Sequence, residues 1–368
     1  MTPAGLSPGT IDQLRGWEGR ERRFAAIDRR ASHAAITRFA LAVGDDNPVW
    51  WSNEPGGFAP PAFLYTGVNF NAWPDFGGLP PVASEPTTTL WTGCRWRWRS
   101  RLRRDECFSA HSVIETIVEA GPPDRRRVEC EERILYTGDD GRTLAEHFRK
   151  ITVMATAAVP TSEPDLGTPY EPDELASFGR AYAAERDIRR GSNLRTADEA
   201  APGTPIGPML KGPLTIGSLV SFATAWGAPQ LPTNRILWLW LEANPEAAVL
   251  RRDTGARDIR DNMHWDAQAW AAAGFTNGFD FAPLRVSWFA HLMADWAGDG
   301  AWLDRLDVEL TRRNGLGDIT WLSGVVSELR DEGGQNARAV CQLEGRNRQG
   351  ELNTRATAEI LLPRAVER

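Results

Sequence analysis

The sequence has few cysteines, no long apolar run and no excess of positive charge. Its four cysteines, Cys94, Cys107, Cys130 and Cys341, lie far apart and form no CxxC pair, so we expect reduced thiols and no metal site. A net charge of -7 argues against nucleic-acid binding, because neutralising phosphates requires a basic surface. The chain lacks the roughly 18 consecutive apolar residues of a membrane span. Its first residues lack the basic-then-apolar layout of a signal peptide, and we expect a cytoplasmic protein.

Tyrosine is also scarce, whereas tryptophan is abundant. The chain has 4 tyrosines and 16 tryptophans among 368 residues. This length suffices for two domains with their own cores. The tryptophans suit either a deep, partly aromatic cavity or simply tryptophan-rich cores, and composition leaves both readings open.

The two halves of the chain repeat one pattern. ITRFALAVG, ending at Gly44, aligns with LVSFATAWG, ending at Gly227. Apolar residues at helical spacing followed by glycine predict a helix with a left-handed cap in each half. Each half then offers a second helix, APPAFLYTG in the first and the almost wholly apolar PLRVSWFAHLMADWAG in the second. A helix that is apolar on nearly every face is normally buried.

Strands follow these helices in both halves. RWRWRSRLRRDECFSAHSVIETIVE alternates with the two-residue period of a sheet, with Trp96 and Trp98 on the opposite face from Arg95, Arg97 and Arg99. Hairpin turns are predicted at Asp139–Gly141 and at Gln349–Gly350. We expect an α+β protein of two tandem hotdog domains, each a curled antiparallel sheet around a long central helix, forming a pseudo-dimer within one chain. The predicted ranges are 1–156, a linker over 157–202 and 203–368.

In its order of motifs the chain resembles the MaoC-like dehydratase/hydratase family in its tandem double-hotdog form. FALAVGDDNPVWW and FAPPAFL resemble the dehydratase N-terminal domain, and HWDAQAWAAAGF, RVSWFAHLMADWAGDG and NGLGD resemble the MaoC C-terminal domain. The resemblance implies addition of water to, or its removal from, an acyl thioester. It also implies an aspartate and a histidine that handle the water and protons, and no cofactor.

Each half departs from the family motif G-D-x-N-P-x-H-x-D. The first half keeps Asp45 and Asn47 but has Trp50 in place of histidine, and an indole cannot shuttle a proton near neutral pH. The second half keeps His264 and Asp266 but has Ala228 in place of aspartate.

The catalytic residues implied by the resemblance are His264, Asp266 and Asp45. One arrangement is a composite site in which Asp45 of the first half meets His264 of the second. In the other, His264 works with a carboxylate of its own region, among Asp258, Asp261 and Asp266, which would orient its ring.

The buried helix of the second half offers further candidates. Arg285, Trp288, His291 and Asp295, together with Asn47 of the first half, are the expected substrate-binding residues. His291 is alternatively a core histidine paired with Asp295, four residues on. Arg285 either binds a substrate carboxylate or thioester carbonyl, or pairs with Asp280 or Asp295.

The sequence as a whole predicts a hydro-lyase. We expect it to act on a bulky β-hydroxyacyl or enoyl group carried on coenzyme A or an acyl carrier protein, by histidine-based acid–base catalysis. Because both motifs are broken, two alternatives stay open: a non-catalytic acyl-binding hotdog subunit, or a cyclase or isomerase that uses the same cavity. The number of chains is also open, with a homodimer among the options.

Overall fold

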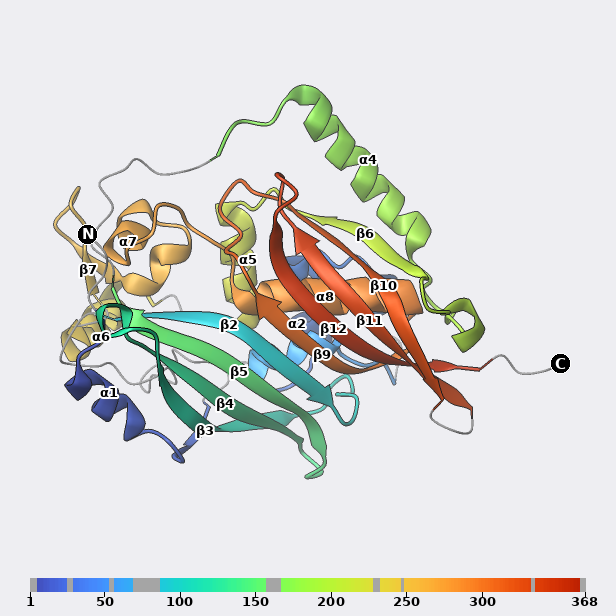
Figure 1. Cartoon of the computed structure of the whole chain (residues 1–368), viewed down its shortest axis with the longest axis horizontal. Coiled ribbons are helices and arrows are strands. Elements are labelled where there is room, and N and C mark those ends of the chain that lie inside the picture. Colours follow the sequence, from blue (N-terminus) through green and yellow to red (C-terminus); the bar gives the residue numbers. More distant parts are fainter. Residues whose placement is uncertain are drawn as a thin grey trace.

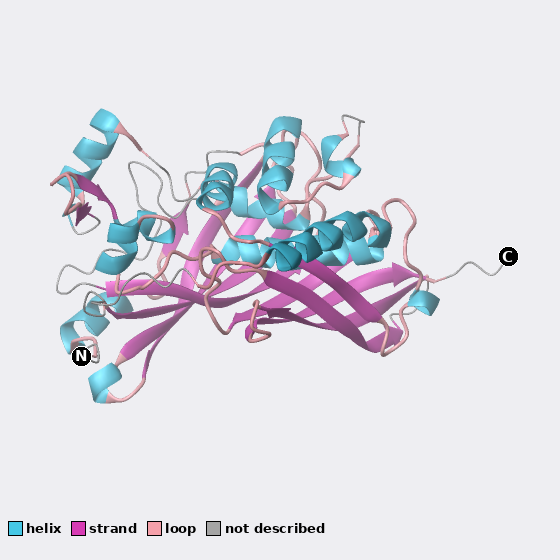
Figure 2. Ribbon diagram, turned by 90° about the horizontal axis from the view of Figure 1, so that it is seen from above, coloured by secondary structure: helices cyan, strands magenta, loops and turns pink. Residues whose placement is uncertain are grey.

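A single ten-stranded antiparallel sheet curls around a set of helices (Figures 1 and 2). The computed structural model describes residues 5–24, 29–52, 56–68, 87–156, 167–227, 232–245, 248–331 and 335–364. The strand order is β1-β3-β4-β5-β2-β9-β12-β11-β10-β6, so strands of the first half occupy one side and strands of the second half the other. This is the predicted pair of hotdog sheets joined edge to edge.

In the first half, the described residues form five strands and several short helices. Its elements are α1 (Pro8–Arg15), β1 (Glu21–Arg23), α2 (His33–Val43), α3 (Pro48–Trp51), η1 (Pro61–Gly67), β2 (Thr87–Trp98), β3 (Phe108–Ala120), η2 (Pro123–Arg125), β4 (Arg127–Gly138) and β5 (Thr143–Ala155). The hairpin turn predicted at Asp139–Gly141 is confirmed. Trp96 and Trp98 are buried while Arg95 and Arg99 bond to Glu131 and Glu146, which confirms the predicted inner and outer faces.

The second half repeats this plan with an added lobe. Its elements are β6 (Pro205–Lys211), α5 (Ile216–Trp226), α6 (Asn234–Ala243), β7 (Ala248–Leu250), β8 (Arg257–Ile259), η5 (Arg260–His264), α7 (Ala267–Ala272), α8 (Ala282–Ala297), β9 (Trp302–Leu310), β10 (Thr320–Asp331), β11 (Asn336–Arg346) and β12 (Leu352–Pro363). The small β7–β8 sheet, α6 and α7 lie between α5 and α8 in the sequence.

The seam between the halves is the pairing of β2 with β9. Gly93 pairs with Glu309 and Arg97 with Arg305. A Cβ at Gly93 would lie 2.5 Å from the Val308 carbonyl oxygen, so the close approach of the two backbones at this point depends on glycine.

The two predicted capped helices, α2 and α5, pack against each other. Each ends at a glycine in the left-handed region, with φ of 72° at Gly44 and 80° at Gly227. The Phe39 and Phe222 ring centroids lie 6.0 Å apart between them. The predicted central helix of the second half is α8, which is buried along nearly its whole length and lies within the curl of β9–β12 (Figure 1).

Two expectations need amendment. In place of the second helix expected in the first half, the described residues contain the 3₁₀ helix η1, and residues 69–86 lie outside the described range. The stretch expected as a linker contains the helix α4 (Pro172–Ile188) and the short η3 (Ala197–Glu199), and α4 packs on β6. No helix in the described ranges is both long and apolar enough to span a bilayer.

Candidate active site

The loop that follows α2 fixes the carboxylate of Asp45. Gly44 ends the helix in the left-handed region, and the side chain of Asp45, the next residue, is buried. Its Oδ1 accepts the backbone N–H of Asn47 at 3.0 Å, and its Oδ2 accepts the indole N–H of Trp50 at 2.7 Å. The tryptophan in the family's histidine position therefore positions the aspartate.

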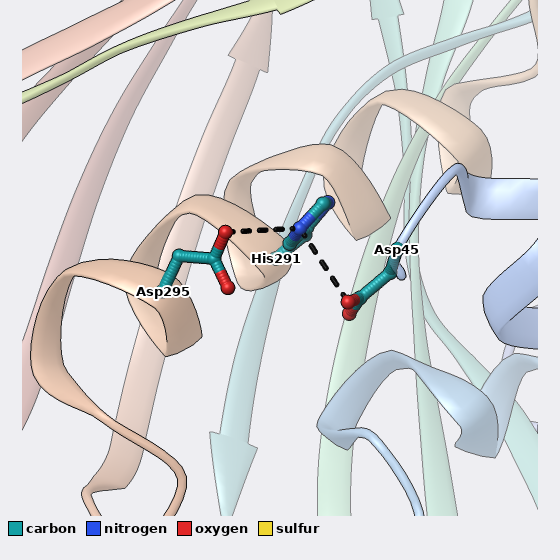
Figure 3. Close-up of side chains that lie close together, drawn as sticks. All are labelled: Asp45, His291 and Asp295. Atoms are coloured by element: carbon teal, nitrogen blue, oxygen red, sulfur yellow. Dashed lines mark ion pairs between the residues drawn. The ribbon is translucent and has the colours of Figure 1, made fainter. Parts of the chain in front are cut away.

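Helix α8 brings a histidine to this carboxylate from the other half of the chain. His291 Nε2 lies 3.5 Å from Asp45 Oδ1 and 3.4 Å from Asp295 Oδ2, which is one helical turn further along α8 (Figure 3). All three residues are at most 5% exposed. A buried aspartate and histidine from different halves thus face each other at the interface between the two hotdog units.

Two further charged side chains surround the imidazole. Glu185 of α4 places its Oε1 3.6 Å from His291 Nε2. Lys211, the last residue of β6, lies on the other side of the ring with its Nζ 2.9 Å from His291 Nδ1. Burial lowers the pKa of the Lys211 ammonium below its usual value, although neighbouring carboxylates, Glu185 first among them, oppose that shift.

Arg189 connects Asp295 of the cluster with Asp46 in the loop after α2. Its Nε donates to Asp295 Oδ1 at 2.9 Å, and its guanidinium also pairs with Asp46. Burial alone would raise the pKa of Asp295, but the neighbouring His291 and Arg189 hold it below its usual value. Three buried carboxylates therefore face one imidazole, one ammonium and one guanidinium, an arrangement in which neighbouring charges compensate each other.

A small, mostly apolar cavity opens onto this cluster. The space between its lining atoms, open solvent at the mouth included, is about 290 Å³, of which about 10 Å³ can hold the centre of a water-sized molecule. Its lining is Phe39, Ala40, Val43, Asp45, Trp50, Pro60, Pro61, Ala62, Ser287, Ala290, His291 and Ala294. Ser287 Oγ donates to the Pro283 carbonyl and Trp50 donates to Asp45. Among the residues that line the cavity, the side chains able to take or give a proton are therefore Asp45 and His291.

The structure brings together Asp45, His291 and Asp295 of the residues singled out from the sequence, with Asn47 beside them. Asn47 caps α3 through Oδ1, and its Nδ2 donates to Asp299 at 2.6 Å. These two bonds occupy both ends of the amide, which gives Asn47 a part in holding the loop.

His264 and Asp266 lie apart from the cluster. His264 Nδ1 is 2.7 Å from the Phe279 carbonyl oxygen, and its ring packs on Phe281 at a centroid distance of 4.0 Å. Burial lowers its pKa to about 4, so the ring is neutral at pH 7. Asp266 caps α7 and pairs with Arg251 at 2.7 Å. The composite arrangement of Asp45 with His264, one of the two considered, is therefore not formed, and His291 lies beside Asp45 instead.

The carboxylates expected to orient His264 form other contacts. Asp258 accepts the side-chain N–H of Asn262 and pairs with Arg251. The Asp261 side chain and Ala228, which stands where the family has aspartate, lie outside the described residues.

Arg285 and Trp288 belong to the core around α8. Arg285 forms a buried ion pair with Asp280 and donates to the backbone carbonyls of Arg312 and Asn353. Of the two structural partners weighed for it, the structure shows Asp280 and not Asp295. Trp288 is buried among core side chains and does not line the cavity.

Sequence reasoning missed Glu185, Arg189 and Lys211. The first two fall in the stretch expected to be a linker. For Lys211 a signal was available, because Lys150 and Lys211 are the only lysines in a chain that otherwise uses arginine.

The donor atoms of Asp45, His291 and Asp295 lie within 4.8 Å of one another and could hold a metal ion. A histidine bound to metal through Nε2 normally donates its other ring N–H to an acceptor. Here Nδ1 meets the Lys211 ammonium, and Arg189 already neutralises Asp295. The residues present fit an acid–base site better than a metal centre.

Comparison with solved structures identifies the fold. A MaoC-like dehydratase matches with a TM-score of 0.60 at 14% identity, covering 96% of this chain and 100% of its own. A putative MaoC domain dehydratase from Chloroflexus aurantiacus gives 0.57 at 10% identity over 95% and 96% of the two chains. A Mycobacterium tuberculosis protein described as a double hotdog gives 0.55 at 11% identity over 97% and 99%.

No protein-family model matches the sequence, and no curated protein matches it by sequence. The chain therefore has the tandem hotdog fold of the MaoC-like dehydratases, at identities that establish the fold alone.

Proposed function

We propose that the protein is a hydratase or dehydratase of an acyl thioester carried on coenzyme A or an acyl carrier protein. The observation that carries the proposal is the approach of Asp45 and His291. The two residues come from different halves and line the same cavity, and His291 Nε2 lies 3.5 Å from Asp45 Oδ1. A buried carboxylate beside an imidazole in a cleft is an acid–base pair of the kind that water addition requires.

The chemistry divides between the two groups. In hydration, Asp45 takes a proton from water as its oxygen attacks the β-carbon of an enoyl thioester, and His291 protonates the α-carbon. Dehydration runs the same steps backwards. Apolar side chains of the cavity, among them Phe39, Val43 and Ala290, would hold the acyl group and exclude bulk water.

The apolar lining also favours a second candidate, a double-bond isomerase. Asp45 and His291 alone suffice to move a proton between two carbons of an acyl chain. Such an enzyme would need no site that holds water. The two candidates differ in product, because hydration adds one water and isomerisation leaves the mass unchanged.

The test is a panel of enoyl-CoA thioesters, from short to bulky, followed by loss of the conjugated-thioester absorbance and by mass spectrometry. Wild type is compared with His291→Gln and, as a matched control, with His264→Gln, which changes a histidine outside the cluster. We expect products one water heavier and a loss of rate confined to His291→Gln. Turnover that depends on His264 would overturn the assignment, and products of unchanged mass would favour the isomerase. Absence of turnover on every thioester would leave an acyl-binding subunit.

A further inference from the structure

Lys211 is directed at the ring nitrogen of His291 that faces away from the carboxylates. The residue is 4% exposed. Its Nζ lies 2.9 Å from His291 Nδ1, 3.4 Å from the Gly44 carbonyl oxygen and 3.7 Å from Glu185 Oε1. A lysine ammonium has three N–H donors and no acceptor. Three acceptors therefore surround it, and His291 Nδ1 is the nearest.

This contact sets the tautomer of His291. Because Lys211 donates, Nδ1 must accept, so a neutral ring carries its proton on Nε2. Nε2 has no hydrogen-bond partner among the described residues, with its carboxylate neighbours at 3.4 to 3.6 Å. The Nε2–H is therefore available to an atom bound in the cavity that His291 lines.

The residue type at this position is unusual for this chain. Of 42 lysines and arginines, only Lys150 and Lys211 are lysine. Buried ion pairs elsewhere use a guanidinium, as at Arg149, Arg189 and Arg285. Arginine cannot release a proton in a protein, whereas a buried lysine can. The residue that contacts His291 Nδ1 is therefore a lysine, whose ammonium can release a proton.

We propose that Lys211 is a positioning residue that supplies His291 with a proton during turnover. As Nε2–H passes its proton to the substrate carbon, a Lys211 N–H passes its proton to Nδ1. The ring then stays neutral, with its proton now on Nδ1, and Lys211 becomes a neutral amine. The proton that Asp45 took from water then passes to His291 Nε2, 3.5 Å from Asp45 Oδ1, while Nδ1 returns its proton to Lys211. The ring recovers its starting tautomer and Lys211 its charge, so the cycle closes without another reactant.

The surrounding charges are compatible with this exchange. Lys211 faces Glu185 of α4, Asp45 after α2 and Asp295 of α8, and Arg189 lies beyond Asp295. The carboxylates favour the ammonium before the step, while burial favours the neutral amine after it. The lowered pKa of Lys211 agrees with a proton that is held loosely. The statement that a substrate carbon accepts the proton rests on the proposed function. The assignment of the His291 tautomer does not depend on it.

The first arm of the test is NMR of the full-length wild-type protein, labelled at the histidine ring nitrogens and the lysine side chains. Two lysine signals are expected, and Lys150→Arg assigns the exposed one. We expect His291 to carry its proton on Nε2, and Lys211 to titrate below the ordinary value for lysine. A proton on Nδ1 of His291, or a Lys211 that titrates like Lys150, would overturn the proposal. This arm needs no activity, so it separates failure of the proposal from failure of the proposed function.

The second arm compares Lys211→Arg and Lys211→Met with Lys150→Arg as the control. Arginine keeps the charge and donors but cannot release a proton. We expect kcat/KM to fall about 100-fold in both Lys211 variants, with KM for the thioester little changed. Wild-type activity should fall at alkaline pH as Lys211 loses its proton, and Lys211→Arg should lack that fall. A Lys211→Arg enzyme with wild-type rate and pH profile would show that lysine supplies charge alone. If a Lys211 variant fails to fold, the proposal is judged on the wild-type NMR result, that is, on the His291 tautomer and the titration of Lys211.

Discussion

Trp50 donates its indole N–H to Asp45 Oδ2 at 2.7 Å, from the position where the MaoC-like motif has its histidine. The opposite oxygen of the carboxylate accepts the backbone N–H of Asn47. The first-half loop thus holds Asp45 through two hydrogen bonds, and the histidine beside it, His291, comes from the other half.

Removing the indole N–H should therefore weaken catalysis without removing a catalytic group. In Trp50→Phe, Asp45 loses a hydrogen bond to a charged acceptor, a contribution of about 1.5–3 kcal/mol. We expect kcat/KM to fall about tenfold. Trp51→Phe is the matched control, because Trp51 is 41% exposed. Equal activities of the two variants would show that the contact does not position Asp45.

Arg285 should contribute to stability and not to substrate binding. Arg285→Met leaves the Asp280 carboxylate buried and uncompensated, which costs about 3–5 kcal/mol. We expect a lower free energy of unfolding in urea, an unchanged KM, and partial recovery in the Asp280→Asn/Arg285→Met double variant. A raised KM with normal stability would restore the substrate-binding role inferred from the sequence.

His264 should destabilise the protein at acid pH. Burial lowers its pKa to about 4, whereas an unfolded histidine titrates near 6.5. Both states are neutral at pH 8, but below 6.5 the unfolded state binds the proton first. Stability is therefore lost as pH falls, by about 2 kcal/mol between pH 8 and pH 5.

Comparing urea unfolding of wild type with His264→Gln isolates this contribution. The difference between their unfolding free energies should itself shrink by about 2 kcal/mol over that pH range. A constant difference would mean that the ring binds a proton as readily in the folded protein as in the unfolded chain, which the acid–base role first inferred for it would allow.

The repeat explains why the fold was predictable. Apolar spacing and a capping glycine are local signals, and they predicted α2, α5 and the buried α8 correctly. The joining of the two sheets edge to edge followed from the idea of a pseudo-dimer, although the sequence did not indicate that β2 and β9 form the seam. The helix α4 was missed because its segment is rich in proline and acidic residues at its start, and such composition also describes linkers.

The site was predictable only in part. Asp45, His291 and Asp295 were all singled out, but the sequence offered His264 as the possible histidine partner of Asp45 and Asp295 as the possible partner of His291. The pairing of Asp45 with His291 depends on how the two halves dock, which spacing along one half does not contain. Glu185 and Lys211 join the cluster through α4 and β6; no local pattern marks Glu185, and the only signal for Lys211 is the scarcity of lysine in the chain.

The central claim is that Asp45 and His291 form one site across the two halves. Its most direct test is a double-mutant cycle of kcat/KM for Asp45→Asn, His291→Gln and the double variant, with folding checked by thermal unfolding. Groups that act as a unit give losses that do not add. We predict that each single change lowers kcat/KM by about 100-fold or more, and that the double variant is no worse than the poorer single one. Additive losses, or full activity in either single variant, would contradict a composite site.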